Sequence, residues 1–232
     1  MTQENETPQL LEQVRQKIDQ AALEAGRAPV EVDLCAVSKT FSEEAIRPAL
    51  EAGHRIFGEN RVQEAESKWL KLKTEYTDVE LHLIGPLQTN KVRKAVDLFD
   101  VIQTLDRPKL AKALADEMER AGRSIPCYIQ INTGGEPQKA GVSPKDADAF
   151  IRMCQVDHGI TVAGLMCIPP QNEEPALHFS LLHDLALRNG LFGLSMGMSA
   201  DYEIAVQFGA TLVRVGSAIF GARTATHVTA AA

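Results

Sequence analysis

Apolar residues recur along the chain in short blocks of two kinds, and the two kinds alternate. Nearly continuous apolar runs, such as residues 162–167 (VAGLMC), are typical of strands that are buried on both faces of a parallel sheet. Between these runs, apolar residues recur three or four positions apart, which is typical of helices with one buried face. The pattern therefore predicts an alternation of buried strands and amphipathic helices.

The alternation is regular enough to predict an architecture. An amphipathic helix ends at Gly26, and eight strand-like runs follow, each continuing into a helical pattern. The predicted strands lie within residues 32–40, 55–57, 81–84, 101–103, 127–131, 162–167, 192–196 and 211–215. Eight such units in 232 residues are close to the length of about 250 residues that is typical of a (β/α)₈ barrel.

We therefore expect an α/β fold, a single (β/α)₈ TIM-type barrel with an added N-terminal helix. An open, doubly wound sheet fits the same alternation, but the GxGxxG pattern that opens a dinucleotide fold is absent after the first strand. Ser42, Asp106 and Ser143 are expected to cap the helices that follow them. We expect residues 9–224 to form the barrel, residues 1–8 to be mobile and residues 225–232 to fray.

Composition narrows the kinds of partner and compartment. The net charge is −7 and no strongly basic cluster occurs, so we expect no nucleic-acid or anionic membrane partner. No apolar run approaches the roughly 18 residues of a membrane span. The four cysteines form no CxxC pair and are expected to be core residues of a cytoplasmic protein. The histidines show no HxH or HExxH spacing, so no metal site is expected.

The first candidate for chemistry is Lys39, because the apolar run of residues 32–40 ends in Ser38-Lys39-Thr40. A lysine at the carboxyl end of a buried strand emerges from an apolar scaffold. Partial desolvation there lowers a lysine pKa toward the uncharged amine that attacks an aldehyde. Most lysines just past a strand are solvated surface charges, and from this stretch alone that interpretation stays open.

Two loops near the C-terminus are candidates for binding phosphate, which barrels of this type commonly bind after their seventh and eighth strands. The first loop carries Met198 and Ser199, and Ser199 is expected to cap the next helix. The second carries Gly216 and Ser217 at another helix start. Each loop alone is more typical of an ordinary helix cap, but the two together favour a phosphate.

Arg214 interrupts the last apolar strand, two positions before Gly216. A buried cation is unfavourable unless it is paired or directed at a polar ligand. One interpretation is a core arginine bridged to a carboxylate on a strand. The other is a permanent cation beside the pyridine nitrogen of a cofactor whose phosphate lies at Gly216 and Ser217. A Schiff-base lysine, a phosphate cup and a ring-facing arginine together predict bound pyridoxal 5′-phosphate (PLP).

Several longer motifs resemble the pyridoxal phosphate homeostasis proteins. They are AVSKT at 36–40, FGENRVQEAESKW at 57–69, HLIGPLQTNK at 82–91, EPQKAGV at 136–142, GLMCIP at 164–169 and GLSMGMSADYEIAVQFGATLVRVGSAIFG at 193–221. The resemblance covers nearly the whole chain. It implies a barrel similar to the N-terminal domain of alanine racemase, with PLP as the cofactor.

The resemblance also implies roles for individual residues. Lys39 would hold PLP as a Schiff base, and Asn60 would contact the cofactor. Ser199, Gly216 and Ser217 would bind its phosphate, Arg214 would face the pyridine nitrogen, and Met198 would line the site. For Met166 a lining role and for His82 a contact near the ring are left open, the alternative for His82 being a structural histidine. Arg61 stands where many family members carry tyrosine, so no aromatic contact is inferred there.

Three functions follow from this site. The first is a non-catalytic PLP-binding protein of intracellular vitamin B6 homeostasis and amino-acid balance, monomeric, with PLP-dependent apoenzymes as recipients. The second is an amino-acid racemase, which needs an acid/base group on the opposite face of the ring that Tyr76, Tyr128 and Tyr202 are not placed to supply. The third is a class I aldolase, in which Lys39 attacks a phosphosugar without a cofactor.

Overall fold

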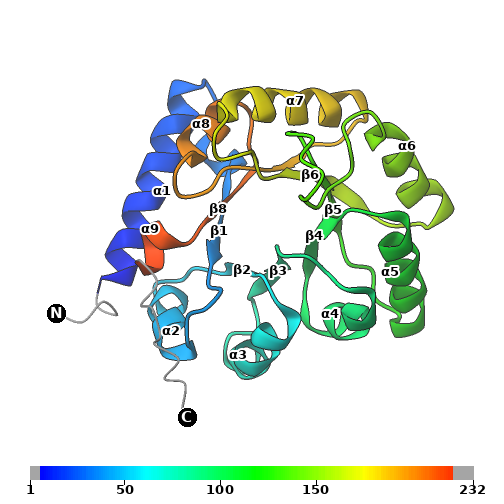
Figure 1. Ribbon diagram of the computed structural model, residues 1–232. Helices are drawn as coiled ribbons and strands as arrows, with labels where there is room; N and C mark the ends of the chain where they lie inside the picture. Colours follow the sequence, from blue (N-terminus) through cyan, green and yellow to red (C-terminus); the bar gives the residue numbers. More distant parts are fainter. Residues whose placement is uncertain (1–5, 222–232) are drawn as a thin grey trace, which may run out of the picture.

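The strands of the protein form a closed parallel barrel in a computed structural model that describes residues 6–221. Among these residues eight strands follow one another around the barrel in chain order, and β8 pairs with β1 (Figure 1). The predicted TIM-type barrel is therefore confirmed. The strands are β1 (Asp33–Val37), β2 (Ile56–Glu59), β3 (Glu80–Leu83), β4 (Val101–Leu105), β5 (Cys127–Ile131), β6 (Val162–Cys167), β7 (Gly193–Ser195) and β8 (Leu212–Val215).

Helices surround the barrel and bury their apolar faces against it. Trp69 on α3 and Phe179 on α7 are among the largest fully buried side chains, and both lie on the apolar stripe of their helix. The helices are α1 (Thr7–Glu24), α2 (Glu43–Glu51), α3 (Val62–Glu75), α4 (Val92–Leu98), α5 (Pro108–Ala121), α6 (Ala147–Arg152), α7 (Pro175–Arg188), α8 (Tyr202–Gln207) and α9 (Ser217–Phe220). None of the helices in the described part of the chain has the length and apolar content that crossing a membrane requires.

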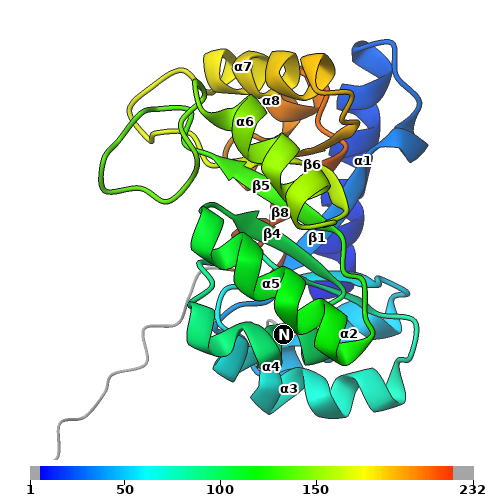
Figure 2. The ribbon, with the colours of Figure 1, turned by 90° about the vertical axis from the view of Figure 1, so that its right-hand side faces the viewer.

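The added helix α1 completes the outer ring where the last two helices are short. It packs against α8, α9 and α2, and Figures 1 and 2 both show it alongside α8. Leu11, Val14 and Ile18 form its buried stripe. After α1, Arg27 donates to the carbonyl oxygens of Val206 and Ala210 at 2.9 Å, which anchors the entry to β1 against the end of α8.

Three predicted helix starts differ from the structure, whereas Ser42 does occupy the N-cap of α2. The N-cap of α5 is Arg107, because Asp106 forms an ion pair with that arginine at 2.5 Å. Residues 143–146 form a turn, and α6 begins after Asp146. The N-cap of α8 is Asp201, whose carboxylate accepts the Met198 N–H at 2.6 Å, so Ser199 is not a helix cap.

The start of the first helix, the start of β7 and the burial of the cysteines can also be compared with the predictions. The first helix begins at Thr7, and most of the segments predicted to be mobile or frayed lie outside the described residues. β7 begins after Phe192, which is 87% exposed. All four cysteines are buried free thiols, as predicted.

Candidate functional site

Lys39 lies where the carboxyl ends of the strands meet, next to the predicted phosphate loop. The register of β1 and β8 pairs Ala36 with Val215, which brings Val37 level with Gly216. A Cβ atom on Gly216 would lie 3.2 Å from the carbonyl oxygen of Val37, so any side chain there would push the two segments slightly apart. Lys39 follows two residues after Val37 and is half-buried.

An aromatic contact joins the same two segments. Phe41, two residues past Lys39, lies 5.1 Å from Phe220 between ring centroids. Phe220 belongs to α9, whose first residue is Ser217. The loop that carries Lys39 and the loop that carries Gly216 and Ser217 therefore open at the same end of the barrel, as a shared ligand requires.

Asn60 directly follows β2, the strand that neighbours β1. Val37 pairs with Gly58, and Lys39 and Asn60 each lie two residues further along the chain, past the ends of β1 and β2. Both candidates therefore lie at the rim, where β1 and β2 end. The backbone of Gly85, after β3, packs so closely on this loop that a Cβ there would lie 2.2 Å from the Asn60 carbonyl oxygen.

The loops after β7 and β8 are hydrogen-bonded to each other. The Gly216 N–H donates to Ser199 Oγ at 3.4 Å, and the Arg214 N–H donates to the Gly197 carbonyl at 3.0 Å. Met198 is 37% exposed on the first of these loops. The sequence-predicted phosphate residues are thus brought together.

Ser217 begins α9, with Gly216 as its N-cap. The N–H groups of Ser217 and Ala218 precede the hydrogen bonds of that helix, so they are donors available at the rim. The Ser217 side chain is exposed on the same surface.

Arg214 is 3% exposed, and burial lowers its pKa from the ordinary value. Its guanidinium donates to Ser195 Oγ at 2.6 Å and to the Cys167 carbonyl at 2.8 Å. Among residues 6–221 no carboxylate forms an ion pair with it, so the interpretation as a core arginine bridged to a strand carboxylate is wrong. A buried cation held by a hydroxyl and a carbonyl keeps its charge available to a polar ligand.

A chain of hydrogen bonds runs from Arg214 across the inside of the barrel. Ser195 Oγ donates to Gln103 Oε1 at 2.5 Å, and Gln103 Nε2 lies 2.6 Å from His82 Nδ1. His82 Nε2 lies 2.5 Å from Glu80 Oε1. Because an amide nitrogen can only donate, Nδ1 accepts and the Nε2–H donates to the carboxylate, so each link has one donor and one acceptor.

The positions of His82 and Met166 bear on the roles left open for them. His82 lines a cavity of about 230 Å³ with Glu80 and Tyr128, among residues at the amino ends of the strands. This placement favours the structural role for His82. Met166 is fully buried and pairs with Ser195 in the register of β6 and β7.

Four buried polar residues at or behind the site were missed from the sequence: Glu59, Lys68, Gln103 and Ser195. Lys68 could have been found, because it lies three residues after Ala65 and four before Leu72, on the buried face of α3. The others stand in short strands, where one polar residue does not interrupt the pattern clearly.

The fold and the rim define the class of protein. The family model described as alanine racemase, N-terminal domain, matches residues 11–224. An alanine racemase from Clostridium difficile shares the fold at 13% identity with a TM-score of 0.66, over 84% of this chain and 53% of that one. The protein is therefore a barrel of the alanine racemase N-terminal type.

Closer relatives narrow this class to one family. The pyridoxal phosphate homeostasis protein of Pseudomonas aeruginosa is 42% identical over 217 residues, covering 90% of this chain and 93% of the relative. The protein of the same name from Escherichia coli K12 is 38% identical over 94% of this chain and 97% of its own length. The chain belongs to the pyridoxal phosphate homeostasis protein family.

Solved structures agree with this assignment. PipY of Synechococcus elongatus is 38% identical, and its structure without PLP matches with a TM-score of 0.78 over 88% of this chain and 99% of PipY. The PipY structure with PLP bound matches with a TM-score of 0.76.

Proposed function

We propose that this protein holds PLP as a Schiff base on Lys39 and acts without catalysis in intracellular PLP homeostasis. The observation that carries the proposal is the convergence of Lys39 with Gly216 and Ser217 at one end of the barrel. The PLP-bound structure of PipY, at 38% identity, supports it.

The residues at the rim fit this cofactor. PLP supplies an aldehyde carbon, with which the Lys39 amine forms a C=N double bond as the carbonyl oxygen leaves as water. The amides of Ser217 and Ala218 and the Ser199 hydroxyl supply hydrogen-bond donors for the phosphate. Asn60 and Met198 complete the lining on either side.

Arg214 determines how strongly the site would activate the cofactor ring. It is a buried cation without a carboxylate partner among residues 6–221, which suits it to donate an N–H to the lone pair of a pyridine nitrogen. A cation in that position disfavours protonation of the ring nitrogen and so weakens the cofactor as an electron sink. The arrangement favours holding PLP over transforming amino acids on it.

The positions of the tyrosines also support a non-catalytic role over a racemase. Tyr128 lines the cavity at the amino ends of the strands, and burial raises its pKa to about 12. Tyr76 stacks under Arg55, 5.5 Å from the guanidinium to the ring centroid. Tyr202 is 4% exposed behind Gly197. None of the three is placed as a second acid/base group opposite Lys39.

The test is the absorbance spectrum of the freshly purified protein before and after borohydride, followed by mass mapping of the reduced peptide. We expect Schiff-base absorbance and a reduced adduct on Lys39, and we expect Lys39→Ala to lose both. A Lys39→Ala variant that keeps the Schiff-base spectrum would show that another lysine binds the aldehyde.

The same preparation separates the alternative functions. Sustained exchange of the α-proton of added amino acids would establish a racemase and overturn the non-catalytic role. A colourless protein that borohydride traps only with a phosphosugar present would establish an aldolase.

We further propose that the protein is a cytoplasmic monomer that passes PLP to PLP-dependent apoenzymes. Four buried free thiols are typical of a reducing compartment. Light scattering of the purified protein tests the monomer, and activation of an apoenzyme held across a dialysis membrane from the loaded protein distinguishes direct transfer from free diffusion.

A further inference from the structure

The segment of residues 38–41, here named the Lys39 loop, has an unusual backbone. Thr40 has φ of 68°, the one positive φ of a non-glycine residue among residues 6–221. A β-branched residue in the left-handed region is strained, so surrounding contacts must hold it there. The strained residue directly follows Lys39.

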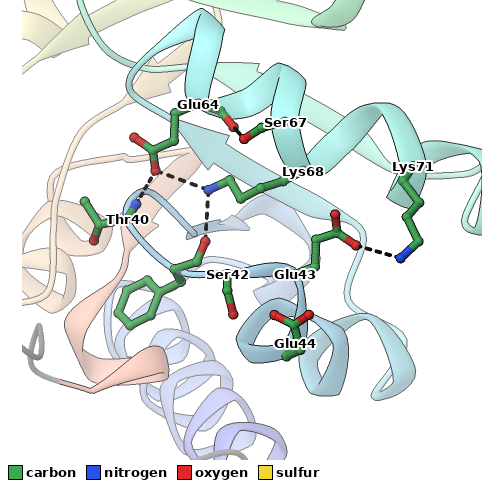
Figure 3. A pocket seen from close by; sticks show the side chains of 9 residues that line it. Thr40, Ser42, Glu43, Glu44, Glu64, Ser67, Lys68 and Lys71 are labelled. Atoms are coloured by element: carbon green, nitrogen blue, oxygen red, sulfur yellow. Dashed lines mark hydrogen bonds and ion pairs between the residues drawn. The ribbon is translucent and has the colours of Figure 1, made fainter. Parts of the chain in front are cut away.

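Two side chains of α3 supply those contacts (Figure 3). The ammonium of Lys68 donates to the carbonyl oxygens of Ser38 and Phe41, both at 3.1 Å. The Glu64 carboxylate accepts the Thr40 N–H and lies 3.3 Å from the same ammonium. Backbone groups on both sides of Lys39 are therefore fixed by one pair of α3 side chains.

The ammonium is buried and balanced by a second carboxylate. Lys68 is 6% exposed, and its Nζ lies 2.8 Å from Oε1 of the fully buried Glu59. The same oxygen accepts Ser38 Oγ–H at 2.6 Å and Trp69 Nε1–H at 3.0 Å, whereas Glu59 Oε2 has no partner among the described residues. Because desolvation offsets most of the attraction in a buried ion pair, stability alone is a weak reason for this arrangement.

The Lys68–Glu59 ion pair lies behind the ends of β1 and β2, on the side away from the candidate site. Ser38 and Glu59 both contact α3, so they point outward from the barrel. Lys39 and Asn60 are the next residues along the chain, at the rim of the barrel. The contacts to Lys68 thus fix the backbone from which the Lys39 amine projects.

We propose that Lys68 is a positioning residue for Lys39. This inference rests on the proposed function and adds to it the group that directs the reacting amine. The Lys68 Nζ has four oxygen acceptors within 3.3 Å, so it is held behind the rim and is not placed to attack the aldehyde. The C=N bond forms at Lys39, with loss of water, because that amine is the one held at the rim.

The test separates positioning from stability by removing both buried charges together. In the double variant Glu59→Gln/Lys68→Met, the introduced amide still accepts the Ser38 and Trp69 donors, and no unpaired buried charge remains. We expect the far-ultraviolet circular dichroism and the urea unfolding of this variant to be near-native. Schiff-base formation with added PLP should be about 10- to 100-fold slower, because the Lys39 amine is no longer held in its reactive orientation. The rate is followed by absorbance.

Lys71→Met is the matched control. Lys71 lies on the same helix and lines a surface depression together with Lys68 and Thr40, but it is exposed and pairs with Glu43 at 3.1 Å (Figure 3). Among the described residues its ammonium forms no hydrogen bond with Ser38, Thr40 or Phe41, the residues that Lys68 and Glu64 hold. We expect Lys71→Met to form the Schiff base at the wild-type rate.

A folded double variant that reacts with PLP at the wild-type rate would overturn the positioning role, and so would a Lys71→Met variant that is slowed equally. A second variant, Glu64→Ala, keeps the proposal testable if the double variant does not fold. It removes the partly exposed acceptor of Thr40 and should slow the reaction by a smaller factor, and an unchanged rate would contradict the proposal. If the wild-type protein forms no Schiff base on Lys39, the proposed function itself fails.

Discussion

Single charged and polar side chains stand where the surrounding sequence is apolar. Arg214 interrupts a buried strand and Lys68 interrupts the buried face of a helix. A buried charge is unfavourable unless its surroundings satisfy it, and both residues are hydrogen-bonded to backbone carbonyls. The interruption was recognised in the strand, where one charge among valines and leucines is conspicuous. It was missed in the helix, where lysines are common.

His54 is a buried residue for which the structure predicts a pH dependence. Burial, assisted by the nearby Arg15 cation, lowers its pKa from 6.5 to about 4. Both nitrogens of the neutral ring have hydrogen-bond partners: Nε2 lies 2.8 Å from the Ile56 carbonyl oxygen, and Nδ1 lies 2.9 Å from the Arg15 guanidinium. The unfolded chain therefore takes up a proton at a higher pH than the folded protein.

The contribution of His54 to stability is complete above pH 6.5 and is lost as the pH falls toward 4. Between pH 7 and pH 5 we expect this residue to account for a loss of about 2 kcal/mol in the free energy of unfolding. Urea titrations at both pH values measure it, with His54→Gln as the comparison. Equal losses in the two proteins would contradict the lowered pKa.

At the scale of elements, the site depends on how closely neighbouring strand ends and loops approach. Glycines permit close contacts there, between Gly85 and Asn60 and between Gly216 and Val37. The sequence located the loops, because a buried strand that ends in turn-forming residues is visible locally. It misplaced several helix starts, because Asp106 and Ser199 use their side chains in an ion pair and a contact with the next loop.

We expect Gly85→Ala to weaken PLP binding. The new Cβ would lie 2.2 Å from the Asn60 carbonyl oxygen, so the loops after β2 and β3 must separate and Asn60 must move. The strain should lower the free energy of unfolding by about 1–3 kcal/mol. Urea unfolding and an absorbance titration with PLP measure the two effects. The exposed Gln88 in the same loop gives a control, Gln88→Ala, which should change neither.

At the scale of the molecule, the barrel encloses a continuous polar chain between its two ends. It begins at Glu80 beside the cavity at the amino ends of the strands and ends at Arg214 near the candidate site. Strands β3, β4, β7 and β8 each supply members, so the chain exists only when the barrel is closed. Closure of the barrel and the orientation of the Arg214 guanidinium are therefore coupled.

Gln103→Leu tests this coupling. It leaves Ser195 Oγ and His82 Nδ1 without their buried partner, which should lower the free energy of unfolding by about 1–3 kcal/mol. Because the support of Arg214 is loosened, we also expect the absorbance of bound PLP to shift. Gln20→Leu, on the exposed face of α1, should do neither. A stability loss with an unchanged spectrum would show that the chain does not orient Arg214.

The sequence by itself determined the alternation of strands and helices, and with it the end of the barrel where Lys39, Gly216 and Ser217 had to meet. The physical reason is that burial imposes a local period on each segment, and parallel strands bring all their carboxyl ends to one rim. Only the tertiary structure decided what holds those residues in place. Gln103 and Ser195 are 92 positions apart, and their hydrogen bond depends on strand register and closure rather than on any local pattern. The same holds for the reach of Lys68 from α3 to the Lys39 loop.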